Sequence, residues 1–361
     1  MKLPVRLAAL FLPCLLLASL AHGQIARSVD PLLGVAGGGN VFPGPVLPFG
    51  MIKPGPDMVA PEGHDANAGW NADGDIRGFS QTHVSGTGGG AKYGNILVQA
   101  TTGEIAPLDS ASPRADEKAS VGLYSVKLAR YNVDVEVTAA RRSAIYRFRY
   151  PAGEKANLLF DVGHYLLSGM RTGEMQSPVS SIIKVLSPTE VAGSTSVKGG
   201  WNKQPNAYTV YFYARTDTPA ASWGTWLGRE LKPGSKDLIG ITVNRGGHEG
   251  IPTLAALDSG SFHPESQAPQ APSNTSDGAW LTFANQSGRP VLMKIGISFI
   301  SVEQARRNLA AEIPGFDFAA THAAALAKWN LALAKIEIKG ATAEQQQIFY
   351  TAIYQIGRAH V

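Results

Sequence analysis

Short apolar runs separated by turn residues occupy most of the chain, from about residue 25 to residue 299. Some of these runs alternate apolar and polar positions, which is the period of a strand with one face in solvent. The clearest runs lie at residues 124–128, 133–140, 143–150, 158–162, 208–214, 238–243 and 291–298. Short strands at this spacing are typical of a β-sandwich. The pattern therefore predicts a mostly β fold, with an antiparallel β-sandwich over residues 24–300.

The hydrophobic period changes at Ser301. Residues 301–304 have the sequence of a capping box, and apolar positions then recur at helical spacing at Val302, Ala305, Leu309 and Ile313. This helix is expected to end before Pro314, and a second helix is expected from about residue 318 to residue 334. We interpret residues 301–335 as a helical linker.

A third helix is predicted after a short extended piece at residues 336–338. Thr342 to Gln345 form a second capping box, and the apolar positions that follow have no later element to bury them. We interpret residues 336–355 as the start of a truncated further domain. The last six residues, 356–361, break the amphipathic pattern and look like a translated sequencing adapter. They are expected to be a non-native tail, and the chain a fragment of a longer protein.

The first 23 residues read as a secretory signal peptide. Lys2 and Arg6 precede an apolar run over residues 7–20, and small residues at 21–23 suit a cleavage site. The apolar run is shorter than the roughly 20 residues that a membrane-spanning helix needs, although retention as an anchor is the alternative. We expect a periplasmic or secreted protein with no membrane partner after cleavage.

Composition narrows the function classes. Cys14, the only cysteine, lies in the predicted signal, which excludes disulfides and cysteine-based zinc sites or nucleophiles from the exported protein. The net charge is +4 without any run rich in Lys and Arg, so neither a nucleic acid nor an anionic membrane is expected as a partner. With 17% charged residues and 40 glycines, the chain suits neutral ligands such as glycans.

Two segments carry residues compatible with sugar binding. The loop at residues 30–57 mixes glycines and prolines with large apolar residues, which favours an ordered loop, either lining a ligand or forming a sandwich edge. Trp70 is either an exposed ring that stacks on a pyranose or a buried core residue. Asp75 and His83 could hydrogen-bond sugar hydroxyls, with a structural role as the alternative for His83. We assign Trp70, Asp75 and His83 as candidate substrate-binding residues.

No catalytic residue and no metal ligand can be assigned from local motifs. Residues 86–91 fit a dinucleotide fingerprint, but a predicted strand follows where that motif needs a helix. Residues 71–76 begin like a calcium-binding loop, but Ile76 stands where the sharp turn needs glycine. No local feature marks two of the acids as a glycosidase carboxylate pair. The residues alone indicate an exported β-sandwich with sugar-compatible loops.

At these residues the chain resembles glycoside hydrolase family 92, the calcium-dependent exo-acting α-mannosidases of bacteria. Four segments match in the family's order: residues 30–57 with their Phe-Pro-Gly and Pro-Phe-Gly-Met steps, residues 76–88, residues 301–329 and residues 349–354. Two segments depart from the family pattern. The step at residues 89–95 lacks the usual acid and has Lys92 near its place, and residues 69–72 replace a Tyr-His-Tyr-Ser motif.

The resemblance implies a sandwich, a helical linker and an (α/α)6 barrel that carries the general acid, the general base and most ligands of a Ca²⁺ cofactor. Residues 336–355 would be the first helix of that barrel, and this fragment would be inactive. The implied function is hydrolysis of α-mannosidic bonds of N-linked glycans or mannans with inversion, with an oligosaccharide or glycoprotein glycan as partner. The alternatives are a non-catalytic carbohydrate-binding or adhesin module and an enzyme for a different α-linked sugar.

Overall fold

The computed structural model describes residues 25–36, 40–59, 65–86, 91–166, 176–202, 206–242, 276–284 and 288–359. The predicted signal peptide and the end of the predicted non-native tail therefore lie outside the described residues. Within the described ranges, no helix is both long and apolar enough to cross a membrane.

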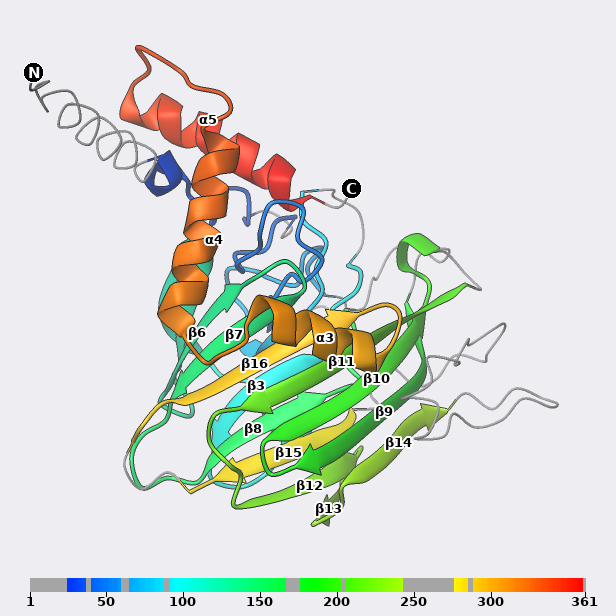
Figure 1. Ribbon diagram of the computed structural model, residues 1–361. Helices are drawn as coiled ribbons and strands as arrows, with labels where there is room; N and C mark the ends of the chain where they lie inside the picture. The colour runs from blue at the N-terminus through cyan, green and yellow to red at the C-terminus, as the bar shows by residue number, and fades with distance from the viewer. Residues whose placement is uncertain are drawn as a thin grey trace, which may run out of the picture.

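Two antiparallel sheets form the body of the molecule (Figure 1). One has seven strands in the order β1 (Gly55–Met58), β2 (Ile76–Ser80), β3 (Leu97–Thr102), β8 (Ala156–Asp161), β15 (Asp277–Phe283), β12 (Ser222–Leu227) and β13 (Glu230–Pro233). The other has nine strands in the order β14 (Asp237–Thr242), β9 (Ser177–Ser187), β10 (Glu190–Lys198), β11 (Ala207–Thr216), β16 (Val291–Ser298), β7 (Ser143–Arg149), β6 (Val133–Ala139), β5 (Leu123–Leu128) and β4 (Arg114–Ser120). The predicted sandwich is confirmed.

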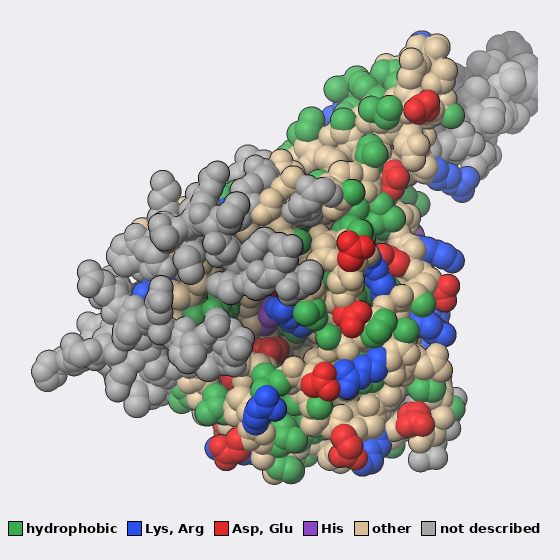
Figure 2. Space-filling view, turned by 180° about the vertical axis from the view of Figure 1, so that it is seen from behind, with side chains coloured by type: hydrophobic (Ala, Val, Ile, Leu, Met, Phe, Trp, Pro, Cys, Tyr) green, Lys and Arg blue, Asp and Glu red, His purple; other side chains and the backbone are tan. Residues whose placement is uncertain are grey.

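The main core lies between the two sheets because inward-facing positions of both sheets are apolar. The rings of Phe160 from β8 and Phe212 from β11 stack with centroids 6.3 Å apart, and Phe79 from β2 meets Tyr146 from β7 at the same distance. Along β5, buried and half-buried positions alternate strictly, as a strand with one core face requires. On the face seen in Figure 2, positive and negative side chains are interspersed.

Three helices follow the last strand, as the helical spacing predicted: α3 (Val302–Glu312), α4 (Phe318–Leu333) and α5 (Ala343–Arg358). Helix α3 covers the outer face of the nine-stranded sheet with its predicted apolar stripe buried (Figure 1). Helix α5 continues past the expected end at residue 355, and residues 336–338 form no strand. The non-native origin of residues 356–361 stays a prediction.

The two predicted capping boxes behave differently. At Thr342 both reciprocal bonds are formed. At Ser301 the hydroxyl accepts from the Gln304 backbone N–H, but the Gln304 side chain donates instead to Asn308 Oδ1 at 2.9 Å. Only half of that box is therefore present.

The first described residues pack against the last two helices. Ala26 N–H donates to Asn330 Oδ1 at 3.1 Å, and Trp329 Nε1 donates to the Val46 carbonyl oxygen at 2.5 Å. The Trp329 ring also lies 4.4 Å from that of Tyr354. Figure 1 shows the short 3₁₀ turn η1 (Ala26–Ser28, blue) beside α4 and α5. These contacts fix one end of the loop over residues 30–57 against the helices.

Candidate functional site

His83 lies at the centre of a buried network that joins the two predicted sugar-binding segments. The strand pair β1 and β2 places it beside Asp57, whose Oδ1 lies 2.7 Å from His83 Nε2. His83 Nδ1 lies 2.7 Å from the Lys53 carbonyl oxygen, so both ring nitrogens face acceptors. His164, which follows β8, donates from Nε2 to the second Asp57 oxygen at 2.8 Å.

The buried negative charge of Asp57 is stabilised by the two histidines that contact it. Burial alone would raise the pKa of Asp57, but the imidazoles of His83 and His164 outweigh it and hold the pKa well below its usual range. The Phe42 ring stacks on His83 with centroids 4.6 Å apart. Gly69 has a φ of +83°, and a Cβ there would lie 2.4 Å from Asp57 Oδ1. The network therefore fixes several loops together.

The three predicted substrate-binding residues occupy different environments. His83 has no exposed surface, and its hydrogen bonds are those expected if the histidine has a structural role. Trp70 is 5% exposed, belongs to the main core and donates from Nε1 to Glu117 Oε1 at 2.9 Å, so the buried alternative holds for its position. Asp75 is exposed, and its carbonyl oxygen accepts from the Val59 N–H. A sugar contact for any of the three stays a prediction.

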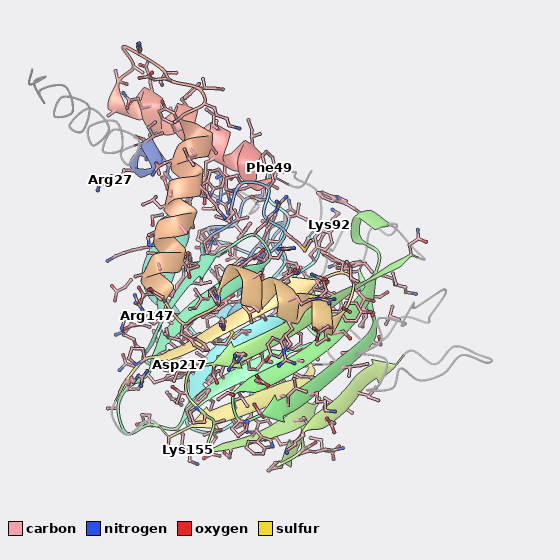
Figure 3. The ribbon with its side chains drawn as sticks, viewed as in Figure 1. Arg27, Phe49, Lys92, Arg147, Lys155 and Asp217 are labelled. Atoms are coloured by element: carbon pink, nitrogen blue, oxygen red, sulfur yellow. The ribbon has the colours of Figure 1, made fainter. Side chains whose placement is uncertain are left out.

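The structure brings out an aromatic cluster that local motifs missed. Trp201, in the turn η3 (Gly200–Asn202), is 39% exposed and meets the ring of Tyr93 edge-on at 6.2 Å. Tyr93 in turn lies 5.4 Å from the ring of Tyr208 on β11. The Lys92 ammonium lies 5.8 Å from the Trp201 centroid, and Figure 3 shows Lys92 at the end of the molecule that carries η3. We call Lys92, Tyr93, Trp201 and Tyr208 the aromatic cluster.

A strained loop holds Tyr93 in this cluster. Tyr93 and the β-branched Ile96 have φ angles of +64° and +60°, which non-glycine residues rarely adopt. Gln176 holds the loop, because its side chain accepts from the Tyr93 N–H at 2.9 Å and donates to the Tyr93 carbonyl oxygen at 3.1 Å. Tyr208 OH donates to the same Gln176 oxygen at 2.8 Å. Strain of this kind gathers at functional sites, so we treat the aromatic cluster as the candidate ligand-facing surface.

One signal in the sequence could have found Trp201. It stands after Gly199 and Gly200 and before polar residues, the same local context that drew attention to Trp70. The local sequence does not distinguish the two tryptophans. Trp70 is covered by Arg114 on β4, more than 40 residues later in the sequence, whose guanidinium lies 4.8 Å from the centroid of the Trp70 ring.

Two neighbouring carboxyls, the buried Asp277 and the half-buried Asp161, lie deeper in the sandwich. Burial, together with the nearby Asp161 carboxyl, raises the pKa of Asp277 to about 8. The Ser181 hydroxyl donates to Asp277 Oδ2, which links β9 to β15 across the sandwich. In the part of the chain that the structure describes, no group of three or more His, Cys, Asp or Glu side chains is arranged to hold a metal ion. The calcium site that the resemblance implies, with most of its ligands in the barrel, stays a prediction.

Comparison with known proteins gives two adjacent family matches. Residues 28–298 match the glycosyl hydrolase family 92 N-terminal domain, and residues 304–359 match the family 92 catalytic domain. The second match begins within α3, so it includes the helices between the sandwich and α5.

Related proteins are longer than this chain. An uncharacterized secreted glycosidase of Arthroderma benhamiae is 26% identical in an alignment over 352 residues, which covers 92% of this chain and 41% of the relative. The solved structure of a family GH92 α-mannosidase from Bacteroides thetaiotaomicron is 28% identical with a TM-score of 0.71, over 92% of this chain and 41% of that one. An inverting GH92 mannosidase from the same organism, 22% identical with a TM-score of 0.69 over 92% and 39% of the chains, shares the fold.

The chain thus spans about two fifths of the length of these relatives. The first family model alone matches well over half of its residues, with the sandwich and the following helices in the family's order. This chain belongs to glycosyl hydrolase family 92.

Proposed function

We propose that this chain is the N-terminal part of an exported exo-α-mannosidase, which hydrolyses α-mannosidic bonds of N-linked glycans or mannans with inversion. The observation that carries the proposal is the match to both family 92 domain models in order along the chain. A relative that is 28% identical is an α-mannosidase, and it has also been solved in complex with mannoimidazole. The fragment alone is proposed to be inactive.

The aromatic cluster would supply the sandwich's contribution to the sugar pocket. The half-exposed ring of Trp201 offers an apolar face that suits the C–H face of a pyranose. Burial raises the pKa of both Tyr93 and Tyr208, so these phenols stay neutral near pH 7 and can bind hydroxyl groups without a charge. The network of Asp57, His83 and His164 would act behind them by positioning the loops.

The general acid and general base are assigned to the longer protein. Inverting glycosidases need two carboxyl groups about 6.5–9.5 Å apart that both reach the sugar. Asp277, the described carboxyl with a strongly raised pKa, is fully buried and cannot meet a substrate. Calcium is assigned to the same part of the longer protein, because the resemblance implies that most of its ligands lie in the barrel.

The test is an assay of the longer protein on aryl mannosides and oligomannose glycans, with and without a chelator. Release of mannose with inverted configuration, lost on chelation, is expected. Binding of mannosides without any release would favour the carbohydrate-binding module instead, and release of another sugar would favour a different α-glycosidase. Turnover that resists the chelator would contradict the calcium assignment.

Trp201→Ala in the longer protein tests the aromatic cluster. We expect kcat/KM to fall about tenfold to a hundredfold, because stacking on a sugar ring is lost. Leu331→Ala, at a side chain that is 69% exposed on α4, is the matched control and should leave kcat/KM unchanged. A Trp201→Ala enzyme with full kcat/KM would remove the aromatic cluster from the site.

A further inference from the structure

A pocket of about 590 Å³ lies where β7 and β16 meet the turn between α3 and α4. Its walls include Arg147, Asp217, Arg289, Leu292, Phe316 and Phe318. Figure 3 shows Arg147 and Asp217 near the lower end of α4, whereas Lys92 of the aromatic cluster lies at the upper end of the sandwich. We call this cavity the corner pocket.

Phe316 supplies a partly exposed aromatic wall. It is half-buried, and the Lys294 ammonium lies 4.7 Å from its ring centroid. That ammonium is itself fixed by donating to the carbonyl oxygens of Ile313, Pro314 and Gly315 at 2.7, 2.8 and 3.2 Å. The neighbouring Phe318 is buried, with the Arg147 guanidinium 4.5 Å from its centroid. The Phe316 ring is therefore fixed in position and keeps exposed apolar surface that a ligand can contact.

Asp217 supplies a fixed polar wall. Its Oδ1 accepts from the Leu292 N–H and from the Thr218 hydroxyl, each at 2.9 Å. Its Oδ2 lies 3.4 Å from a guanidinium nitrogen of Arg289, whose side chain is 75% exposed. A carboxylate held beside a guanidinium in this way presents acceptors and donors to neighbouring hydroxyl groups.

The charges around the corner pocket are balanced. Arg147 donates to both oxygens of Glu136, at 2.5 and 2.6 Å, and Arg289 is paired with Asp217. Asp317 caps α4 by accepting from the Ala320 N–H at 2.8 Å. The pocket lining itself has two arginines, Arg147 and Arg289, and two carboxylates, Asp217 and Asp317, so it has little net attraction for a phosphate or a carboxylate ligand.

We propose that the corner pocket is a second saccharide-binding site, separate from the aromatic cluster, that takes a neutral hexose unit. A neutral sugar ring with several hydroxyl groups binds to an aromatic face and to fixed hydrogen-bonding groups. The corner pocket offers Phe316 as the aromatic face and the Asp217–Arg289 pair as the hydrogen-bonding groups, and its lining has little net charge. That the hexose is mannose rests on the proposed function. A second contact of this kind would hold a branched or polymeric glycan and raise its local concentration at the first site.

The test is a titration of the isotope-labelled 361-residue chain with α-1,2-mannobiose, followed by amide chemical shifts in a Trp201→Ala background. Shifts are expected at the amides of residues 289, 291, 292 and 316–319, since Pro290 has no N–H. Phe316→Ala and, as the milder surface change, Arg289→Ala should each weaken binding at these amides about tenfold. Arg229→Ala, at an exposed arginine in the turn between β12 and β13, is the matched control and should leave it unchanged.

Two results would overturn the proposal. One is a chain whose shifts on titration stay away from both residue ranges. The other is displacement of the sugar from these amides by inorganic phosphate, which would make the corner pocket an anion site. The proposed function can fail separately. If the longer protein lacks mannosidase activity, the shifts at the corner pocket would still be observed. If the enzyme is active but the corner pocket shows no shifts, only this inference is contradicted.

Discussion

At the residue scale, Asp57 is the side chain on which the loop network depends. Its carboxylate is fully buried and binds two imidazoles, so Asp57→Asn would take a buried carboxylate away from both His83 and His164. We expect the variant to lose about 3–5 kcal/mol of unfolding free energy at pH 7. Urea denaturation measures this loss, and Asp134→Asn, at a half-exposed ion pair, is the control that should cost about 0.5 kcal/mol or less.

Asp57 also affects how the stability of the folded protein falls in acid. Because its pKa in the folded state lies below the ordinary 3.8, its contribution is complete above about pH 4 and is lost as the pH falls further. The Asp57→Asn variant should therefore show a flatter loss of stability below pH 4. Parallel acid unfolding curves for the two proteins would contradict this assignment.

Asp277 should act in the opposite direction. Its pKa of about 8 in the folded state lies above the ordinary 3.8, so the folded state keeps a proton that the unfolded state releases. Stability from this group is then greatest below about pH 4 and falls by roughly 1.4 kcal/mol per pH unit towards pH 8. Asp277→Asn should remove that slope in urea unfolding between pH 5 and pH 8. An unchanged slope would show that the carboxyl is already ionised in the folded protein.

Residue roles were the least predictable level. Trp70 and Trp201 have similar neighbours in the sequence, yet one is covered by Arg114 and bound to Glu117 while the other is 39% exposed. The partners of Asp57 are likewise His83 and His164, which lie 26 and 107 residues after it in the sequence. Such partners are set by sheet pairing, which local context does not contain.

At the scale of elements, the hydrophobic period predicted the strands β5, β6, β7, β8, β11, β14 and β16, and the helices α3 and α4 within two residues. The long strands β9 and β10 were not among the runs it marked. It could not predict strand order. β8 pairs with β15, and the register brings Leu159 opposite Trp280, more than 100 residues away. Turn chemistry does not encode such a pairing, because no tight turn joins the two strands.

Lys294 stabilises the corner between α3 and α4. Lys294→Met would leave three carbonyl oxygens without their charged donor, and we expect a loss of about 1.5–3 kcal/mol in unfolding free energy. Faster hydrogen exchange at residues 313–319 should accompany it. Lys184→Met, at a 42% exposed lysine on β9, is the control. Equal stabilities for the two variants would remove the proposed role of the ammonium.

At the scale of the whole molecule, the chain should fold without calcium. Our proposal assigns the calcium ligands to the longer protein, so neither added Ca²⁺ nor a chelator should shift the stability of this chain through a bound ion. We expect the melting temperature of the 361-residue chain to change by about 1 °C or less between excess Ca²⁺ and excess chelator. A rise of several degrees with Ca²⁺ would place a binding site within this chain.

The packing of residue 26 against Asn330, and of residue 30 against Thr351, has a consequence for synthesis. A ribosome adds about 5–20 residues per second, so the opening segment waits on the order of 15–60 seconds before its partners emerge. During that interval Phe42 and Val46, both buried in the finished protein, have no helices to cover them. Until residues 330–351 have been synthesised, the leading end of the chain therefore needs protection from association with other chains.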